Sequence, residues 1–227
     1  MFDILLNMKR KIKKPLLIFT FSFCVCFVFA QQDEKAKSIL ESVTRTTKSF
    51  TSVQATFDYI MDNKEEGIHE ENRGEIVMKG DKYQLKLPQL GMEVYCDGKN
   101  VWSYMKDANE VNVTSVEDES SEMMNPSRLF TIYEDGFDYR FVGENTTGGK
   151  RVYAIDLIPQ TGEVDYSKIR IQIDQQQMVI KQAEMVGKEG NNYLVRVNHL
   201  KTGVPTDDSL FIFDASKHPG AEIIDLR

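Results

Sequence analysis

The sequence predicts a mainly β protein with some α-helix: an unclosed, strongly curved antiparallel β-barrel, or half-barrel, covered by lid helices. From residue 51 onward, apolar and polar residues alternate with a period of two, in short runs that turn residues separate at hairpin spacing. Residues 33–50 instead carry apolar side chains at helical spacing. A sheet with one apolar face needs a cover in water, and helices this small leave part of a curved face free. The pattern therefore also predicts an apolar cavity.

Residues 1–30 have the pattern of a signal peptide. Five basic residues lie between positions 9 and 14, an apolar run follows over residues 16–29, and Ala30 stands at a plausible cleavage position. The run is shorter than the ~20 apolar residues that a membrane span needs. An uncleaved N-terminal anchor is the alternative. We expect export to the periplasm and one mature domain over residues 31–227.

The charge of the mature chain narrows the class of binding partner. Residues 1–30 hold five of the 28 basic and one of the 35 acidic residues, so the mature chain has 23 basic and 34 acidic residues and a net charge of −11. This balance argues against nucleic acid and against anionic lipid headgroups as partners.

Cys96 is the only cysteine after residue 30. The domain therefore depends on its core alone, as fits a bacterial periplasm.

Two helices are predicted as covers of the sheet. In residues 33–50 a stripe of apolar side chains lies opposite the charged ones, and Ser38 and Glu41 have the spacing of a capping box. The Asn-Pro pair at 125–126 is suited to begin a short helix over residues 126–134.

Short strands account for most of the remaining chain. Ile169, Ile171 and Ile173 alternate with polar residues and form the clearest one-faced strand. The predicted strands cover residues 53–59, 76–78, 82–87, 92–96, 101–105, 153–157, 169–173, 179–185, 192–200 and 210–213.

One predicted hairpin carries the only tryptophan. The Asp97-Gly98 turn links two apolar runs, and Trp102 and Tyr104 stand two positions apart on the second run. Residues two apart in a strand share a face, so the two aromatic rings make one large amphipathic surface. That surface belongs either to the core or to a ligand cavity, and the sequence leaves both open.

The sequence shows no catalytic constellation, so we expect a protein that is not an enzyme and that uses no cofactor. His69, His199 and His218 lie on separate predicted elements, which argues against a metal site. The S-x-x-K pattern at residues 103–106 falls on a predicted strand, whereas that nucleophile belongs at a helix start.

Taken together, these segments resemble the LolA-type periplasmic lipoprotein carriers over essentially the whole mature chain. The resemblance is carried, in order along the chain, by residues 48–57, 74–79, 97–104, 125–126, 157–159 and 211–224. It implies one LolA-like lipoprotein-carrier domain, acting as a monomer. Such a carrier takes an acylated lipoprotein from an inner-membrane ABC transporter, shields its acyl chains and passes it to an outer-membrane acceptor. Where well-studied members have an Arg-Pro pair that holds the lid, this chain has Lys79-Gly80, so Lys79 is the candidate for lid control.

The candidate lipid-cavity residues are aromatic and aliphatic side chains of the predicted strands and of the short helix. They are Phe57, Met78, Tyr83, Leu85, Trp102, Tyr104, Leu129, Phe130, Ile155, Leu157, Ile171 and Phe213. For each of them taken singly, an ordinary core role is the alternative.

Energetics set a condition on such a carrier. Sheltering a whole acyl chain gains on the order of 10 kcal/mol, at about 0.8 kcal/mol for each CH₂. The chain has no nucleotide-binding motif, so release requires an imperfect cavity or a lid that competes with the ligand; the helices over residues 33–50 and 126–134 are the candidate moving covers. Two other functions fit the same fold: a lipid-sensing domain that controls a membrane partner, and a carrier of another lipid such as a glycolipid.

Overall fold

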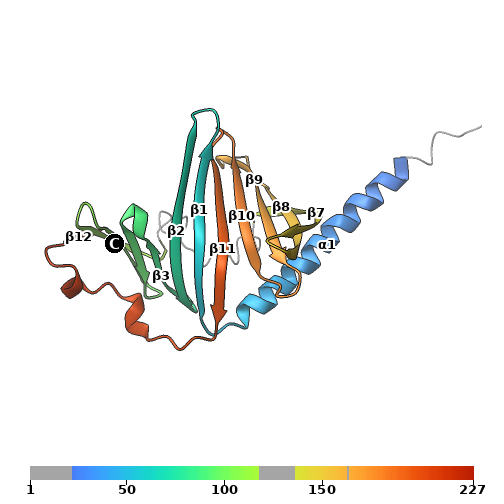
Figure 1. Ribbon diagram of the computed structural model, residues 1–227. Helices are drawn as coiled ribbons and strands as arrows, with labels where there is room; N and C mark the ends of the chain where they lie inside the picture. Colours follow the sequence, from blue (N-terminus) through green and yellow to red (C-terminus); the bar gives the residue numbers. More distant parts are fainter. Residues whose placement is uncertain (1–21, 118–135, 163) are drawn as a thin grey trace, which may run out of the picture.

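The computed structural model describes residues 22–117, 136–162 and 164–227, with side chains from residue 33 onward. Within these residues, one twelve-stranded sheet is accompanied by one α-helix, and the predicted half-barrel is confirmed (Figure 1). The strand order is β12-β6-β5-β4-β3-β2-β1-β11-β10-β9-β8-β7, so β12 and β7 are the two edges and the sheet is not closed. The predicted helix over residues 126–134 lies outside the described residues.

The strands agree with most of the predicted ones, and several of them are longer. They are β1 (Val53–Asn63), β2 (Ile68–Lys79), β3 (Lys82–Leu87), β4 (Met92–Cys96), β5 (Asn100–Met105), β6 (Glu110–Ser115), β7 (Phe137–Thr147), β8 (Lys150–Pro159), β9 (Tyr166–Asp174), β10 (Ile180–Gly187), β11 (Asn192–Thr202) and β12 (Glu222–Asp225). Neighbouring strands are antiparallel except β12, which pairs with β6 in parallel. The central pair β1 and β11 joins the two halves of the sheet.

The helix α1 (Ser22–Lys48) is longer than the predicted helix over residues 33–50. Because it begins at Ser22, Ser38 and Glu41 lie in its interior and do not form a cap, so the capping-box prediction was wrong. Arg45 and Lys48 stand in the last turn, where positive charge complements the helix dipole.

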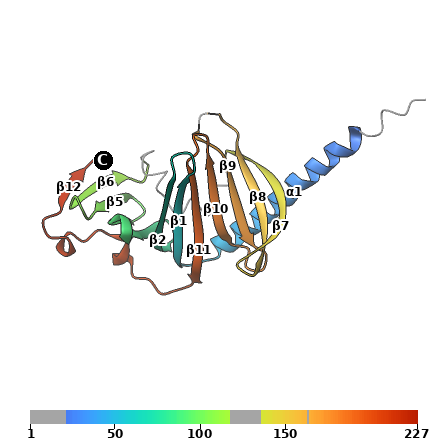
Figure 2. The same cartoon turned by 45° about the horizontal axis from the view of Figure 1, so that its top comes forward.

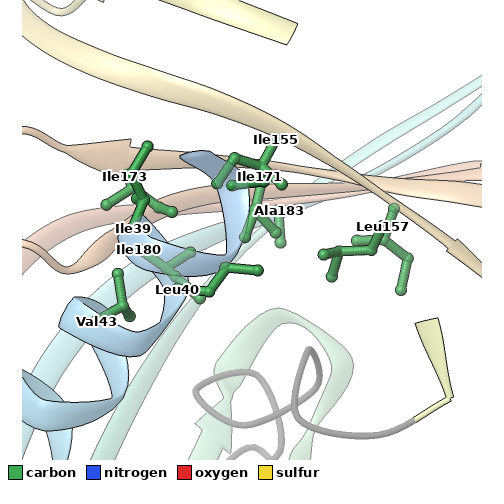
Figure 3. Packing of buried hydrophobic residues seen from close by; sticks show 11 residues of the cluster. Ile39, Leu40, Val43, Ile155, Leu157, Ile171, Ile173, Ile180 and Ala183 are labelled. Atoms are coloured by element: carbon green, nitrogen blue, oxygen red, sulfur yellow. The ribbon is translucent and has the colours of Figure 1, made fainter. Parts of the chain in front are cut away.

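One apolar stripe of α1 holds it on the sheet. Ala36, Ile39, Leu40 and Val43 are buried against isoleucine and leucine side chains of β8, β9 and β10 (Figure 3). We call the face of the sheet on which α1 lies the inner face and the opposite face the outer face. Directly paired residues of neighbouring strands share a face, so the register assigns each side chain to one of the two.

The outer face of β8 and β9 carries a group of paired charges. The Asp156 carboxylate accepts hydrogen bonds from Arg170 Nε and Nη2 at 2.6 and 2.8 Å and from Lys168 Nζ at 3.2 Å. Burial alone would raise the pKa of Asp156, but these cationic donors outweigh it and lower the pKa. The charge is therefore retained on a largely buried residue.

The C-terminal segment, residues 203–221, crosses the outer face from β11 to the far edge of the sheet (Figure 2). It contains two short 3₁₀ helices, η3 (Asp208–Phe211) and η4 (Ala215–Lys217), before β12. The predicted strand over residues 210–213 was therefore wrong. Asp207 accepts a hydrogen bond from the Ser209 backbone N–H, which turns the chain into η3.

Candidate functional site

The inner face divides into two buried clusters. The helix cluster joins the apolar stripe of α1 to β8, β9 and β10, with Ile155, Leu157 and Ile171 fully buried at its centre. The hairpin cluster covers β1 to β5. Its buried members are Val53, Ala55, Ile76, Met78, Tyr83, Leu85, Val94, Cys96 and Val101.

Between the two clusters lies an apolar band that is only half buried. It is formed by three directly paired positions of β1 and β11, and we call it the central strip: Phe57 with Val197, Tyr59 with Val195, and Met61 with Tyr193. The rings of Tyr59 and Tyr193 stack with centroids 6.2 Å apart. Phe57 and Val197 pack on the hairpin cluster, while Ala183 and Met185, which pair with Val195 and Tyr193, belong to the helix cluster. The strip thus connects two buried regions across one apolar face.

Phe57 lies over a glycine of the neighbouring strand. Gly74 is directly opposite Phe57, and a Cβ atom added to Gly74 would lie 2.2 Å from Phe57 Cζ. The missing side chain of Gly74 therefore makes room for the ring. The contact with Gly74 fixes the position of the Phe57 ring at the border between the central strip and the hairpin cluster.

Replacing Gly74 by alanine is expected to displace the Phe57 ring and to lower the free energy of unfolding by about 1–3 kcal/mol, as overpacking does. Urea denaturation measures the difference. Gly162→Ala is the matched control, because no atom lies within 4 Å of its added Cβ and its backbone is not left-handed. If both variants lost the same amount of unfolding free energy, the packing of the Phe57 ring would not depend on the missing side chain of Gly74.

The predicted cavity residues are distributed over both faces. Seven lie on the inner face: Phe57, Met78, Tyr83, Leu85, Ile155, Leu157 and Ile171. Leu129 and Phe130 lie outside the described residues. Trp102, Tyr104 and Phe213 share the outer face, where the rings of Tyr104 and Phe213 are 5.7 Å apart under the C-terminal segment. One cavity cannot be lined from both faces of one sheet, so the candidate site is the inner face.

Trp102 and Tyr104 share a face, as predicted, and belong to an outer aromatic cluster. Tyr104 Oη donates a hydrogen bond to Asn109 Oδ1 at 3.0 Å, and its ring contacts the ring of His218 at 4.3 Å between centroids. The ring contacts of Tyr104 with Phe213 and His218 tie the C-terminal segment to β5. The cluster is core beneath that segment.

Lys79, the candidate for lid control, anchors the same C-terminal segment. Its Nζ donates to the Thr206 carbonyl at 3.2 Å and pairs with Asp208 Oδ1 at 2.7 Å, while Lys82 Nζ lies 2.6 Å from Asp208 Oδ2. Both lysines are on the outer face, whereas α1 lies on the inner face. The contact seen is thus with the C-terminal segment, and a role of Lys79 in lid control stays a prediction.

This anchor is expected to be acid-sensitive. Hydrogen bonds from Lys79 and Lys82 lower the pKa of Asp208 from 3.8 to about 2. A carboxyl group whose pKa is lower in the folded than in the unfolded state stabilises the fold fully at a pH above its unfolded pKa. This stabilisation is lost as the pH falls through the pKa of the folded state. We therefore expect the segment to loosen between about pH 4 and pH 2, with a red shift of the emission of Trp102, which lies beneath it.

Two variants separate this loosening from general acid unfolding. Asp208→Asn is expected to shift the Trp102 emission already at pH 7. Glu144→Gln removes a distant carboxylate that pairs with Lys35 and Arg151 and should leave the emission unchanged. An emission that follows far-UV circular dichroism at every pH would contradict a separate release of the segment.

Some features of the site were not predicted from the sequence. Tyr193 and Val195 were placed on a strand but were not singled out, and β7, which supplies Phe137, Tyr139 and Phe141 to the inner face, was missed. In the part of the chain that the structure describes, His, Cys, Asp and Glu side chains form no group of three suited to a metal ion. No helix in that part has the length and apolar character to span a membrane.

An open, mainly antiparallel sheet with a helix packed on its apolar inner face defines a fold of the half-barrel class. A family model described as "Uncharacterized protein" matches residues 90–202. An uncharacterized protein of Methanocaldococcus jannaschii is 25% identical over 122 residues, which are 53% of this chain and 34% of that protein. The chain thus spans about a third of the length of this curated relative.

The comparison with solved structures finds similar chains in several bacteria. An uncharacterized conserved protein from Thermus thermophilus aligns over 84% of this chain and 99% of its own, at 15% identity and a TM-score of 0.59. A LolA superfamily protein from Nitrosomonas europaea aligns over 79% of this chain and 98% of its own (13% identity, TM-score 0.43). The lipoprotein LppX of Mycobacterium tuberculosis aligns over 77% of this chain and 100% of its own (14% identity, TM-score 0.46). At 15% identity, the likeness to the Thermus thermophilus protein concerns the fold alone.

Proposed function

We propose that this protein is a periplasmic lipoprotein carrier that shields acyl chains on its inner face and shuttles lipoproteins from the inner to the outer membrane. The observation that carries the proposal is the central strip, a half-exposed aromatic and aliphatic band between two buried clusters. The sequence resemblance to LolA-type carriers supports it. The proposal includes cleavage after residue 30, a single domain over residues 31–227 and no catalytic activity.

The geometry suits reversible binding. An acyl chain on the central strip replaces water on one side only, so it gains less than the ~0.8 kcal/mol for each CH₂ that full burial supplies. The strip borders the helix cluster along β10, through Ala183 and Met185, and in that cluster the stripe of α1 covers Ile155 and Ile171. A ligand that extends past the strip therefore competes with α1 for the same apolar surface, and α1 is the proposed moving cover.

The proposed partners follow from the direction of transport. An inner-membrane ABC transporter supplies the energy to extract the acylated lipoprotein, because this chain has no nucleotide-binding motif of its own. An outer-membrane acceptor then takes the cargo from the half-exposed strip. The carrier acts as a monomer in this scheme.

Native mass spectrometry of the protein purified from its own periplasm tests the proposal. We expect a co-purified acylated lipoprotein, or an adduct after incubation with a triacylated lipopeptide. The deacylated form of the same peptide is the control and should not bind, since the acyl chains supply the binding energy. A bare protein mass in all samples would contradict the carrier function and favour the lipid-sensing alternative with a filled core.

A further inference from the structure

Two polar side-chain atoms are buried without a hydrogen-bond partner within the described residues, Thr47 Oγ1 and the hydroxyl oxygen of Tyr83, and the latter lies on the inner face of the sheet. Tyr83 of β3 is 1% exposed, and within the described residues its hydroxyl has no hydrogen-bond partner. It stands opposite Met78 and Cys96 in the hairpin cluster, among apolar side chains. Native proteins pair nearly all buried polar atoms, because an unpaired one keeps the cost of leaving water without a compensating bond. The hydroxyl of Tyr83 is therefore a candidate hydrogen-bond donor to a ligand.

Other buried tyrosines of this sheet do have partners. Tyr104 donates to Asn109 Oδ1 at 3.0 Å and Tyr95 donates to Glu93, both on the outer face. Burial, together with the neighbouring Cys96 thiol, raises the pKa of Tyr83 above its ordinary value. Tyr83 is thus a neutral phenol, and a neutral phenol is a hydrogen-bond donor.

Tyr83 lies on the same inner face of the sheet as the central strip. Phe57, which belongs to the strip, packs on the hairpin cluster that contains Tyr83. Phe57 is opposite Gly74, whereas Tyr83 is opposite Met78, four positions further along β2. A ligand therefore reaches Tyr83 from the strip only by extending along the inner face over the buried side chains between them. The hydrocarbon part of such a ligand would contact apolar side chains, and Tyr83 would offer the polar contact.

We propose that the Tyr83 hydroxyl donates a hydrogen bond to the ester carbonyl oxygen of an acylated ligand, and so selects acyl esters over hydrocarbons and alkyl ethers. The inference rests on the proposed carrier function and narrows its ligand class. A carbonyl is a strong acceptor that carries no charge, so it satisfies the phenol inside an apolar cluster without burying an ion.

The test compares two soluble lipids that differ in the ester carbonyls: a short-chain diacyl phosphatidylcholine and its dialkyl ether analogue. Dissociation constants are measured by isothermal titration for the wild type, Tyr83→Phe and Tyr104→Phe. The wild type is expected to bind the ester roughly threefold to tenfold more tightly than the ether, the range of one net hydrogen bond. Tyr83→Phe should lose this preference, and Tyr104→Phe should keep it.

The remaining outcomes separate the inference from the carrier proposal. A preference for the ester that survives in Tyr83→Phe overturns the inference and leaves the carrier function standing. A wild type that binds neither lipid, or binds both equally, overturns the inference, whereas the carrier function is decided separately by binding of the triacylated lipopeptide. Tyr83→Phe without ligand should melt no lower than the wild type, since no partner among the described residues is lost. A fall in melting temperature equal to that of Tyr104→Phe would mean that the phenol already has a hydrogen-bond partner in the free protein, and would also overturn the inference.

Discussion

Replacing Ile171 by alanine is expected to lower the free energy of unfolding by about 2–5 kcal/mol, the range for large-to-small changes in a packed core. Ile171 is fully buried in β9, between Ile155 of β8 and Ala183 of β10, and faces the apolar stripe of α1. Its removal leaves a cavity beneath the helix that the paired strands cannot close. Urea denaturation followed by circular dichroism measures the change.

The matched control makes the same chemical change at an exposed isoleucine. Ile223 of β12 is 57% exposed, so Ile223→Ala should alter the free energy of unfolding by less than about 0.5 kcal/mol. If Ile171→Ala were as mild as Ile223→Ala, the helix cluster would not be the core of this half of the sheet. The inner face under α1 would then be open to ligand in its entirety.

The strand pattern could be predicted because one face of each strand is covered and the other is not. In β9, Ile169, Ile171 and Ile173 all point into the helix cluster, so the sequence alternates with a period of two. The same alternation is present in β7, where Phe137, Tyr139 and Phe141 reach the inner face, and it was overlooked. That missed strand was within reach of sequence reasoning.

Which face a residue occupies could not be predicted. In β5 both Val101 and Trp102 are apolar, because the hairpin cluster covers the inner face and the C-terminal segment covers the outer face. A strand that is apolar on both sides gives no period, and no local pattern says which side holds a ligand. The prediction that Trp102 lines the cavity therefore depended on information that only the strand register supplies.

Long-range polar contacts escaped prediction for a related reason. Lys79 and Asp208 are 129 positions apart, and their pairing follows from the path of the C-terminal segment across the outer face. The hydroxyl of Tyr83 is equally invisible in sequence, since an alternating strand shows that the ring is buried but not whether its oxygen has a partner. Both features arise from packing between distant segments.

Introducing a charge into the central strip is expected to have the largest effect on ligand binding. Val195→Asp places a carboxylate on the inner face between Tyr59 of β1 and Ala183 of β10. An acyl chain lying there would desolvate the new charge without a partner, so the affinity for a triacylated lipopeptide should fall at least tenfold, about 1.4 kcal/mol or more. Because Val195 is half exposed in the absence of ligand, the fold should persist.

The neighbouring residue of the same strand provides the control. Leu194 is also half exposed but points to the outer face, where it stands opposite Glu184, so Leu194→Asp should cost at least as much stability as Val195→Asp. Its affinity for the lipopeptide should nevertheless remain within about twofold of the wild type, because no acyl chain reaches that face. If both variants lost the same affinity for the lipopeptide, binding would not depend on which face carries the charge. The assignment of the ligand to the inner face would then fail. A loss confined to Val195→Asp would place the acyl chains on the half-exposed band between the two buried clusters.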